Sequence, residues 1–305
     1  MEYVLETRSL CKRYKDFQAL DGLDMHVPKG AIYGFVGKNG AGKTTLIRQI
    51  CGLQNPTSGE FSIFGVPCQN EAEISKARLR MGAVVETPSI NTRMTAKENL
   101  KEQYRLIGLP DFDGIDELLK LVGLENTGNK AAGNFSLGMR QRLGIAIALC
   151  GHPDFLVLDE PVNGLDPEGI VEIRELILKL NREENITVLI SSHILDELSK
   201  LATWYGFIDS GHMICEMSAE EMENASHKSI GVEVSDMNAL CRAMEQRKLN
   251  YKVISERKAE IYADISVSEL VHALEDESCE LISSSMHDES LESFYMNLLG
   301  GEAHE

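Results

Sequence analysis

One glycine-rich segment constrains the fold of this 305-residue chain more than any other feature. An apolar run over residues 31–36 precedes the segment and predicts a buried strand, and a helical pattern over 42–52 follows it. A strand, a glycine-rich turn and a helix in this order predict an α/β domain whose turn wraps around an anion. The segment has the pattern G-x-x-x-x-G-K-S/T and reads Gly37, Lys38, Asn39, Gly40, Ala41, Gly42, Lys43, Thr44, Thr45.

The residue types of this segment suit phosphate groups. Glycines let backbone N–H groups turn inward around the β- and γ-phosphates of a nucleotide, and the helix near Gly42 points its positive dipole end at the same anion. Lys43 supplies a positive charge to the phosphates, and Thr44 offers a hydroxyl to Mg²⁺. A glycine-rich turn that binds nothing is the alternative, and the strand and helix on either side argue against it.

Two adjacent carboxylates end a second apolar run. Residues 155–158 predict a strand buried on both sheet faces, and Asp159 and Glu160 follow it directly. Asp159 at the strand tip is predicted to hold Mg²⁺ through its water shell. Glu160 points to the other side and is predicted to orient and deprotonate an attacking water. Two acids that merely end a strand are the alternative, which becomes weak once the glycine-rich segment is present. The pair therefore predicts hydrolysis of the bound nucleotide.

The order of elements predicts a large first domain over residues 1–220. Residues 187–191 form a further buried apolar run, and strand patterns vanish between about 91 and 151. We therefore expect a parallel core sheet, an antiparallel β portion and an all-helical insertion over about 91–151. Helices are predicted over 95–108, which opens with a capping box, and over 116–122, 138–150 and 167–181.

Residues 226–305 follow a different pattern. Their predicted elements come in the order β-α-β-β-α-β, which is typical of a ferredoxin-like unit. We therefore expect a small C-terminal α+β domain, ending in an amphipathic helix. Strands are predicted over 230–234, 251–255, 259–264 and 281–284, and helices over 238–246, 268–275 and 290–299.

Charge and composition exclude several classes of protein. The net charge of −18, of which −11 lies from Glu221 onward, argues against a nucleic-acid partner and against docking on anionic lipid by charge. Seven scattered cysteines without a CxxC pair predict free thiols in a reducing compartment. The acidic N-terminus lacks a signal-peptide pattern, and the apolar runs are too short to span a membrane. We expect a cytoplasmic protein.

Residues 134–143, NFSLGMRQRL, resemble the signature segment of the ATP-binding cassette (ABC) family. The resemblance implies that Ser136 and Gly138, at a helix N-terminus, contact the γ-phosphate of ATP bound to a second copy of the chain. A plain capped helix is the alternative. The segment departs from the family pattern at Leu137 and Met139, where the family usually has glycine and glutamine.

Other residues resemble the family's remaining motifs in the same order along residues 3–220. The loop over residues 163–166 resembles the one that touches the partner copy, and His193 resembles the histidine that senses the γ-phosphate. Tyr14 resembles the aromatic residue that stacks on adenine, with Phe17 as the alternative. Glu86 stands where the family usually has a glutamine that senses Mg²⁺. A carboxylate also binds a hard cation, and a solvated loop glutamate is the alternative.

The resemblance implies an ATPase that works as a dimer around two ATP molecules and drives a separate transmembrane permease from the inner face of the cell membrane. Three further segments narrow the resemblance to the branch of the family linked to bacitracin export and lantibiotic self-protection. They are residues 85–88, 94–100 and 294–301. A soluble cassette acting in translation or repair and a non-catalytic regulatory cassette are the alternatives. The absence of a second cassette and of a heptad run disfavours the first, and the presence of the catalytic residues disfavours the second. A third alternative is a kinase built on the same glycine-rich segment, a P-loop kinase. This alternative leaves the signature segment and the position of His193 unexplained.

Overall fold

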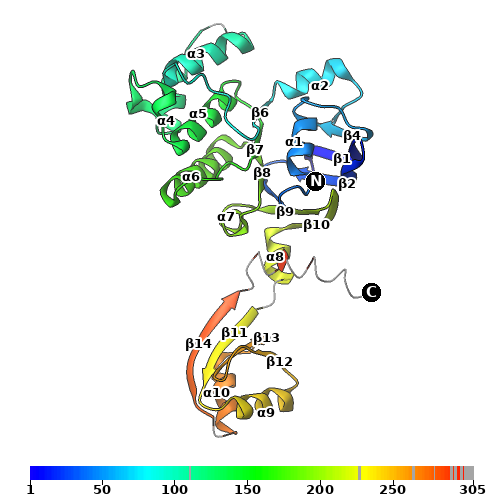
Figure 1. Ribbon diagram of the computed structural model, residues 1–305, viewed down its shortest axis with the longest axis vertical. Helices are drawn as coiled ribbons and strands as arrows, with labels where there is room; N and C mark the ends of the chain where they lie inside the picture. The colour runs from blue at the N-terminus through cyan, green and yellow to red at the C-terminus, as the bar shows by residue number, and fades with distance from the viewer. Residues whose placement is uncertain are drawn as a thin grey trace. The chain divides into compact units, whose positions relative to one another are not determined.

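The computed structural model describes residues 1–109, 111–225, 228–262, 265–277, 279–288, 291, 294–295 and 298. The chain divides into two units, Met1–Ala219 and Glu220–Glu305 (Figure 1). Each unit has a hydrophobic core of its own. Within the described residues, no helix is both long and apolar enough to cross a membrane.

Two β-sheets form the framework of the first unit. One is mixed and six-stranded, and its strands are β3 (Ile32–Val36), β6 (Met81–Val84), β7 (Phe155–Asp159), β8 (Thr187–Ser192), β9 (Trp204–Asp209) and β10 (His212–Ser218). Its order is β10-β9-β3-β8-β7-β6, with all neighbours parallel except β10 and β9. The other sheet is antiparallel with the order β2-β1-β4-β5, and its strands are β1 (Tyr3–Tyr14), β2 (Phe17–Pro28), β4 (Ser58–Ile63) and β5 (Val66–Pro67).

The parallel strands bring distant parts of the sequence to one edge of the six-stranded sheet. Every residue of β3, β7 and β8 is buried, as their uninterrupted apolar runs predict. Val36 pairs with Ser192, and Asp159 pairs with Ser191, so the three strands end side by side. The segments that follow them carry the glycine-rich turn, the two carboxylates and His193.

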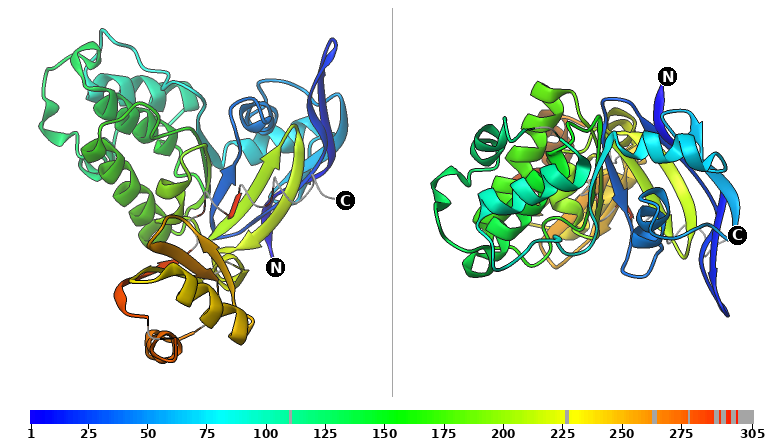
Figure 2. Two further views of the ribbon diagram at one scale, coloured as in Figure 1. Left: turned by 60° about the horizontal axis from the view of Figure 1, so that its bottom comes forward. Right: turned by 90° about the horizontal axis from the view of Figure 1, so that it is seen from above.

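Different helices cover the two faces of the six-stranded sheet. α1 (Lys43–Ile50) packs between the two sheets through Leu46, Ile47 and Ile50. On the opposite face lie α5 (Leu137–Leu149), α6 (Pro167–Glu184) and α7 (Leu195–Ser199), drawn in green and yellow-green in Figure 2. Their approach is close, because a Cβ on Gly82 of β6 would lie 2.3 Å from the Ala148 carbonyl oxygen of α5.

The insertion between β6 and β7 is helical, as predicted. The capping box is confirmed, because the Thr95 side chain accepts from the Glu98 N–H and the Glu98 side chain accepts from the Thr95 N–H. Gly108 ends that helix in the left-handed conformation, at φ 76°. The insertion contains α3 (Ala96–Ile107), α4 (Ile115–Leu121), the short 3₁₀ helices η1 (Glu125–Thr127) and η2 (Ala132–Asn134), and α5, while α2 (Glu71–Arg78) precedes β6.

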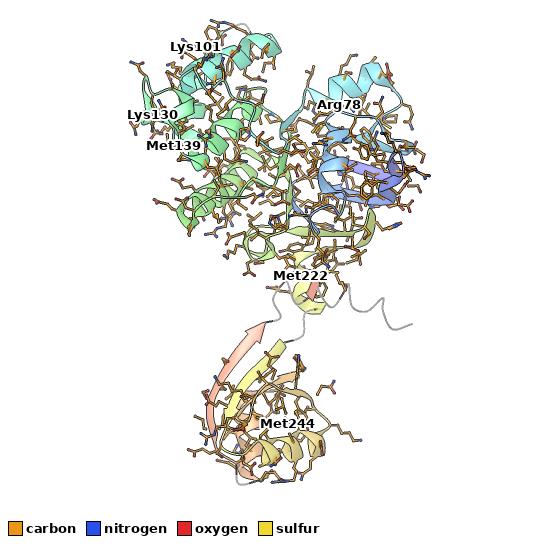
Figure 3. All side chains as sticks on the ribbon, in the orientation of Figure 1. Arg78, Lys101, Lys130, Met139, Met222 and Met244 are labelled. Carbon is orange, nitrogen blue, oxygen red and sulfur yellow. The ribbon has the colours of Figure 1, made fainter. Side chains whose placement is uncertain are left out.

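The second unit has the predicted β-α-β-β-α-β order, preceded by α8 (Ala219–Ala225). The sheet order is β12-β13-β11-β14 with all neighbours antiparallel. Both helices pack on one face, where Met244 belongs to the core (Figure 3). The helix predicted over 290–299 falls largely outside the described residues. The elements are β11 (Lys228–Val234), α9 (Met237–Arg247), β12 (Asn250–Val253), β13 (Lys258–Tyr262), α10 (Val267–Glu275) and β14 (Leu281–Asp288).

Candidate active site

The glycine-rich segment joins β3 to α1 at the edge of the six-stranded sheet. A Cβ on Gly37 would lie 2.5 Å from the Ile208 carbonyl oxygen, and one on Gly42 would lie 2.6 Å from the Ala19 carbonyl oxygen. Gly42 also has φ 113°, which a residue with a side chain rarely adopts. Gly42 is the N-cap of α1 and provides no side-chain cap. The N–H groups of the first turn of α1 are therefore suited to an anion.

Lys43 places its ammonium group inside this turn. The side chain is only 5% exposed, and Nζ donates to the carbonyl oxygens of Gly37 and Lys38, the latter at 3.2 Å. Nζ also lies 3.3 Å from Glu160 Oε1. A buried ammonium group is costly without such partners. The same donors suit the oxygens of a phosphate that enters the turn. Lys38, Asn39 and Gly40 are exposed, Ala41 is buried, and Thr44 and Thr45 are half-buried.

Glu160 connects Lys43 with His193. Its second carboxylate oxygen, Oε2, lies 2.7 Å from His193 Nδ1. Because an ionised carboxylate only accepts hydrogen bonds, Nδ1–H is the donor, and the other ring nitrogen stays available for a ligand. The structure therefore brings Lys43, Glu160 and His193 together from three separate strand ends, although 117 residues separate Lys43 from Glu160 in the sequence.

Ser191, which the sequence analysis did not single out, ties both carboxylate residues to β8. The Glu160 N–H donates to the Ser191 carbonyl oxygen at 3.1 Å and to Ser191 Oγ at 3.0 Å. These bonds hold Glu160 at φ 50°, a left-handed conformation that costs a residue with a side chain about 1 kcal/mol. Ser191 Oγ donates to Asp159 Oδ1 at 2.5 Å. A serine at the end of a fully buried apolar strand is the signal that could have identified it.

Asp159 fits a divalent cation. The residue is 1% exposed, and in the described part of the chain its Oδ2 atom has no hydrogen-bond partner. A buried carboxylate oxygen without a partner is costly unless a cation or its bound water satisfies it. Thr44 lies in the first turn of α1, directly after the glycine-rich segment, and offers a hydroxyl oxygen. Asp159 and Thr44 together are a donor set of the hard oxygens that Mg²⁺ prefers.

The thiol of Cys51 lies close enough to Asp159 to sense its charge. Burial raises the pKa of this thiol to about 12, Arg78 opposes the shift, and the Asp159 carboxylate adds to it. The thiol is therefore protonated at neutral pH and adds no negative charge beside the two carboxylates.

Glu86 lies in the loop that follows β6, at φ 59°, and its carboxylate pairs with the Arg48 guanidinium. The side chains are 53% and 41% exposed, so solvent screens the pair. Arg48 lies one helical turn beyond Thr44 on α1, so the two side chains share a helix face. Sequence analysis had not identified Arg48 as a partner of Glu86.

Tyr14, the last residue of β1, pairs with Phe17, the first residue of β2, in the antiparallel register of the two strands. Both rings are exposed. The Tyr14 hydroxyl donates to Gln54 Oε1, and Lys12 Nζ lies 5.3 Å from the Tyr14 ring centroid. The strand that begins at Phe17 reaches the glycine-rich turn through Ala19. Because both rings are exposed, each has a face free for stacking on a flat ligand.

Ser136 and Gly138 lie apart from this cluster, at the start of α5 on the opposite face of the six-stranded sheet. Figure 3 shows Met139 on α5 and Arg78 on α2 on different sides of the unit. Ser136 is exposed and caps α5, because its Oγ accepts from the Met139 N–H at 3.2 Å. A Cβ on Gly138 would meet only Leu165 and Gly169, each at 3.9 Å. The signature segment thus packs on the loop over residues 163–166 and leaves its N-terminal face open.

Comparison with known proteins gives the family. The ABC transporter family model matches residues 20–163. A bacitracin transport ATP-binding protein of Bacillus licheniformis is 40% identical over 305 residues, covering 99% of each chain. A lantibiotic transport ATP-binding protein of Streptococcus pyogenes is 40% identical over 222 residues, covering 72% of this chain and 93% of the relative.

A similar solved structure supports the same family assignment. It is a dimeric ATP-binding cassette in a post-hydrolysis state bound to ADP and Pi, with a TM-score of 0.64 at 25% identity. The alignment covers 70% of this chain and 98% of the solved one. The predicted fold class and the resemblance drawn from the motifs are confirmed. The chain belongs to the ABC transporter family and is one of its ATP-binding ATPases.

Proposed function

We propose that Lys43, Glu160 and His193 carry out the hydrolysis of ATP in this chain. The supporting observation is that the Glu160 carboxylate lies 3.3 Å from Lys43 Nζ and 2.7 Å from His193 Nδ1. When phosphate oxygens occupy the turn, Lys43 donates to them, which frees Oε1 of Glu160 to accept a proton from the attacking water. His193 donates Nδ1–H to the carboxylate and keeps it oriented, and with its other ring nitrogen also protonated it donates a second hydrogen bond to the γ-phosphate.

The remaining site residues bind and position the nucleotide. The N–H groups of residues 37–45 surround the phosphates, and Tyr14 stacks on adenine with Phe17 as the alternative. Asp159, Thr44 and Glu86 hold Mg²⁺, which when bound neutralises charge on the phosphates. The orphan Asp159 Oδ2 atom supports this assignment.

A second copy of the chain completes each site. Ser136 and Gly138 lie on the opposite sheet face from Lys43, so they are poorly placed to reach the phosphates of their own chain. Placed across a two-fold axis, the open start of α5 directs its N–H groups at the partner's γ-phosphate. The dimeric state of the solved cassette supports this arrangement.

The cargo is a peptide antibiotic of the bacitracin or lantibiotic class, exported through a separate transmembrane permease. The observation that carries this is the 40% identity to a bacitracin transport protein along 99% of the chain, including the second unit. The chain would work at the cytoplasmic face of the cell membrane, bound to that permease. Full-length similarity to a transport protein disfavours a cassette acting in translation or repair.

Antibiotic resistance tests this proposal. The chain would be expressed in a bacitracin-sensitive bacterium together with its proposed transmembrane permease, and compared with the same pair carrying Glu160→Gln. We expect a higher inhibitory concentration of bacitracin, or of a lantibiotic tested in parallel, only for the unchanged chain. Equal inhibitory concentrations for both pairs and all peptides would contradict the cargo assignment.

A further inference from the structure

The two loops that carry Glu160 and His193 each lead directly into a helix. Glu160 begins the loop that ends at α6, and His193 lies in the short connection from β8 to α7. The Ser192 side chain closes that connection, because its Oγ accepts from the Ile194 N–H at 2.9 Å. β8 anchors one side of this connection and α7 the other, so α7 helps to set the position of His193, and α6 anchors the far end of the loop that begins at Glu160.

One ion pair joins these two helices. Arg174 Nη1 on α6 lies 3.2 Å from Glu197 Oε2 on α7, and each side chain is only 19% exposed. Partial burial reduces solvent screening, so this pair is stronger than an exposed one. Arg174 shares its helix face with Ile170 and Ile177, and these residues line a small crevice with Pro161 and Leu198. The pair thus closes the space directly behind the Glu160 loop.

Both ions keep a second partner on their own side of the pair. Glu197 Oε1 lies 2.7 Å from Lys200 Nζ on the same stretch of chain, and Arg174 Nε lies 3.8 Å from Glu175 Oε1. Removing one ion therefore cuts the connection between the helices without leaving its partner as an isolated half-buried charge. Such an isolated charge is what makes most broken ion pairs strongly destabilising.

The sheet fixes α7 from the other side. A Cβ on Gly34 of β3 would lie 3.5 Å from Leu198 Cδ1 and 3.3 Å from Ala202 Cβ, so α7 and the residues after it rest directly on the sheet. These contacts are apolar and act across the sheet face, so they set the distance of α7 from the sheet rather than its position along the sheet. The Arg174–Glu197 pair opposes movement of α7 along the sheet.

We propose that Arg174 and Glu197 are positioning residues that hold His193 at hydrogen-bond distance from Glu160. The proposal rests on the proposed catalytic roles of Glu160 and His193. Neither Arg174 nor Glu197 contacts the glycine-rich turn in the described structure, so their loss leaves ATP binding unchanged. Displacement of His193 by about 1 Å is enough to reduce the rate of the chemical step strongly.

Steady-state hydrolysis by the purified full-length chain tests the proposal. Arg174→Met, Glu197→Gln and the double variant are compared with Lys179→Met, which removes an exposed ion pair within α6 (Lys179 Nζ to Glu183 Oε2, 3.9 Å). We expect each of the first three to lower kcat about tenfold with the half-saturating ATP concentration unchanged. The double variant is expected to be no slower than either single one, because both remove the same connection. Arg174→Lys keeps the charge and is expected to recover most of kcat.

Two results would overturn the proposal. One is a kcat within about twofold of the unchanged chain for both Arg174→Met and Glu197→Gln. The other is a fall in kcat matched by weaker ATP binding, or by a lower thermal midpoint not seen with Lys179→Met, because that indicates general destabilisation. Glu160→Gln is measured alongside. If hydrolysis survives this change, the proposed function is contradicted. If Glu160→Gln abolishes hydrolysis while Arg174→Met stays fully active, only the positioning role is contradicted.

Discussion

The two segments expected to face the γ-phosphate differ in how complete they are within one chain. Around Lys43, side chains from three strand ends contact one another, with Glu160 joined to both Lys43 and His193. Around Ser136, the only hydrogen bond of the side chain is local, to the Met139 N–H, as far as the structure describes it. The first segment is supported by many parts of the chain, and the second only by its own helix and one loop.

This difference follows from sheet topology. Parallel strands deliver the segments after β3, β7 and β8 to the same edge, so residues far apart in sequence converge there. The helices that connect the strands cover both faces, and α1 and α5 happen to lie on opposite ones. We call the cluster around Lys43, Glu160 and His193 the assembled half-site and the start of α5 with Ser136 and Gly138 the displayed half-site. One half-site built inside the chain and one exposed on its surface suit an active site shared between two copies.

Glu160→Gln is the substitution expected to break the assembled half-site most severely. The amide preserves the size of the side chain but accepts protons poorly, so hydrolysis should fall by about 10² to 10⁴. ATP binding should persist, because Lys43 and the glycine-rich turn are unchanged. Phosphate release and binding of a fluorescent ATP analogue measure the two properties, with the exposed Glu168→Gln on α6 as the control. Unchanged hydrolysis would remove Glu160 from its proposed role.

The sequence predicts the assembled half-site well because its signals are local. The glycine-rich turn lies between an apolar run and a helical pattern, and the paired acids end another apolar run. Each such run predicts its strand, and parallel pairing then places Lys43, Asp159, Glu160 and His193 at one edge. The capping box at Thr95 is similarly local and was predicted to the residue.

The side-chain bonds between elements are not predictable in the same way. Ser191 bridges Asp159 and Glu160 because β7 and β8 pair in one particular register. The residues of a single apolar run do not reveal the register in which the strand pairs with its neighbour. Arg48 on α1 pairs with Glu86 in the loop after β6, although the two residues are 38 positions apart in the sequence. The sequence shows each charge but not which partner it finds.

Ser136→Arg is expected to disable the displayed half-site, and mixing experiments sharpen the comparison. A bulky cation at the start of α5 blocks the approach of a partner's phosphates, so hydrolysis should fall to background while ATP binding to the single chain persists. Mixed in equal amounts with Lys43→Met, which is also inactive, it should restore about a quarter of normal activity, because half of the dimers then contain one intact composite site.

The mixing result separates the two arrangements of the site. A mixture that stays inactive would show that Lys43 and Ser136 must belong to the same chain, against the shared site. Ser75→Arg, on the exposed face of α2, serves as the matched control and should leave hydrolysis unchanged. Size-exclusion chromatography with ATP verifies that the two variants exchange partners.

Glu86→Gln probes the loop between the two half-sites and should have the smallest effect. Its carboxylate pairs with Arg48 of α1, while Pro88 packs on α5 so closely that a Cβ on Gly144 would lie 2.5 Å from Pro88 Cβ. The exposed Glu86–Arg48 pair contributes at most about 1 kcal/mol, so the maximal rate should change less than about fivefold. An amide binds Mg²⁺ more weakly than a carboxylate, so half-maximal hydrolysis should need severalfold more Mg²⁺. An unchanged Mg²⁺ requirement, measured by titration at saturating ATP, would identify Glu86 as a solvated loop residue and leave Asp159 and Thr44 to hold the cation.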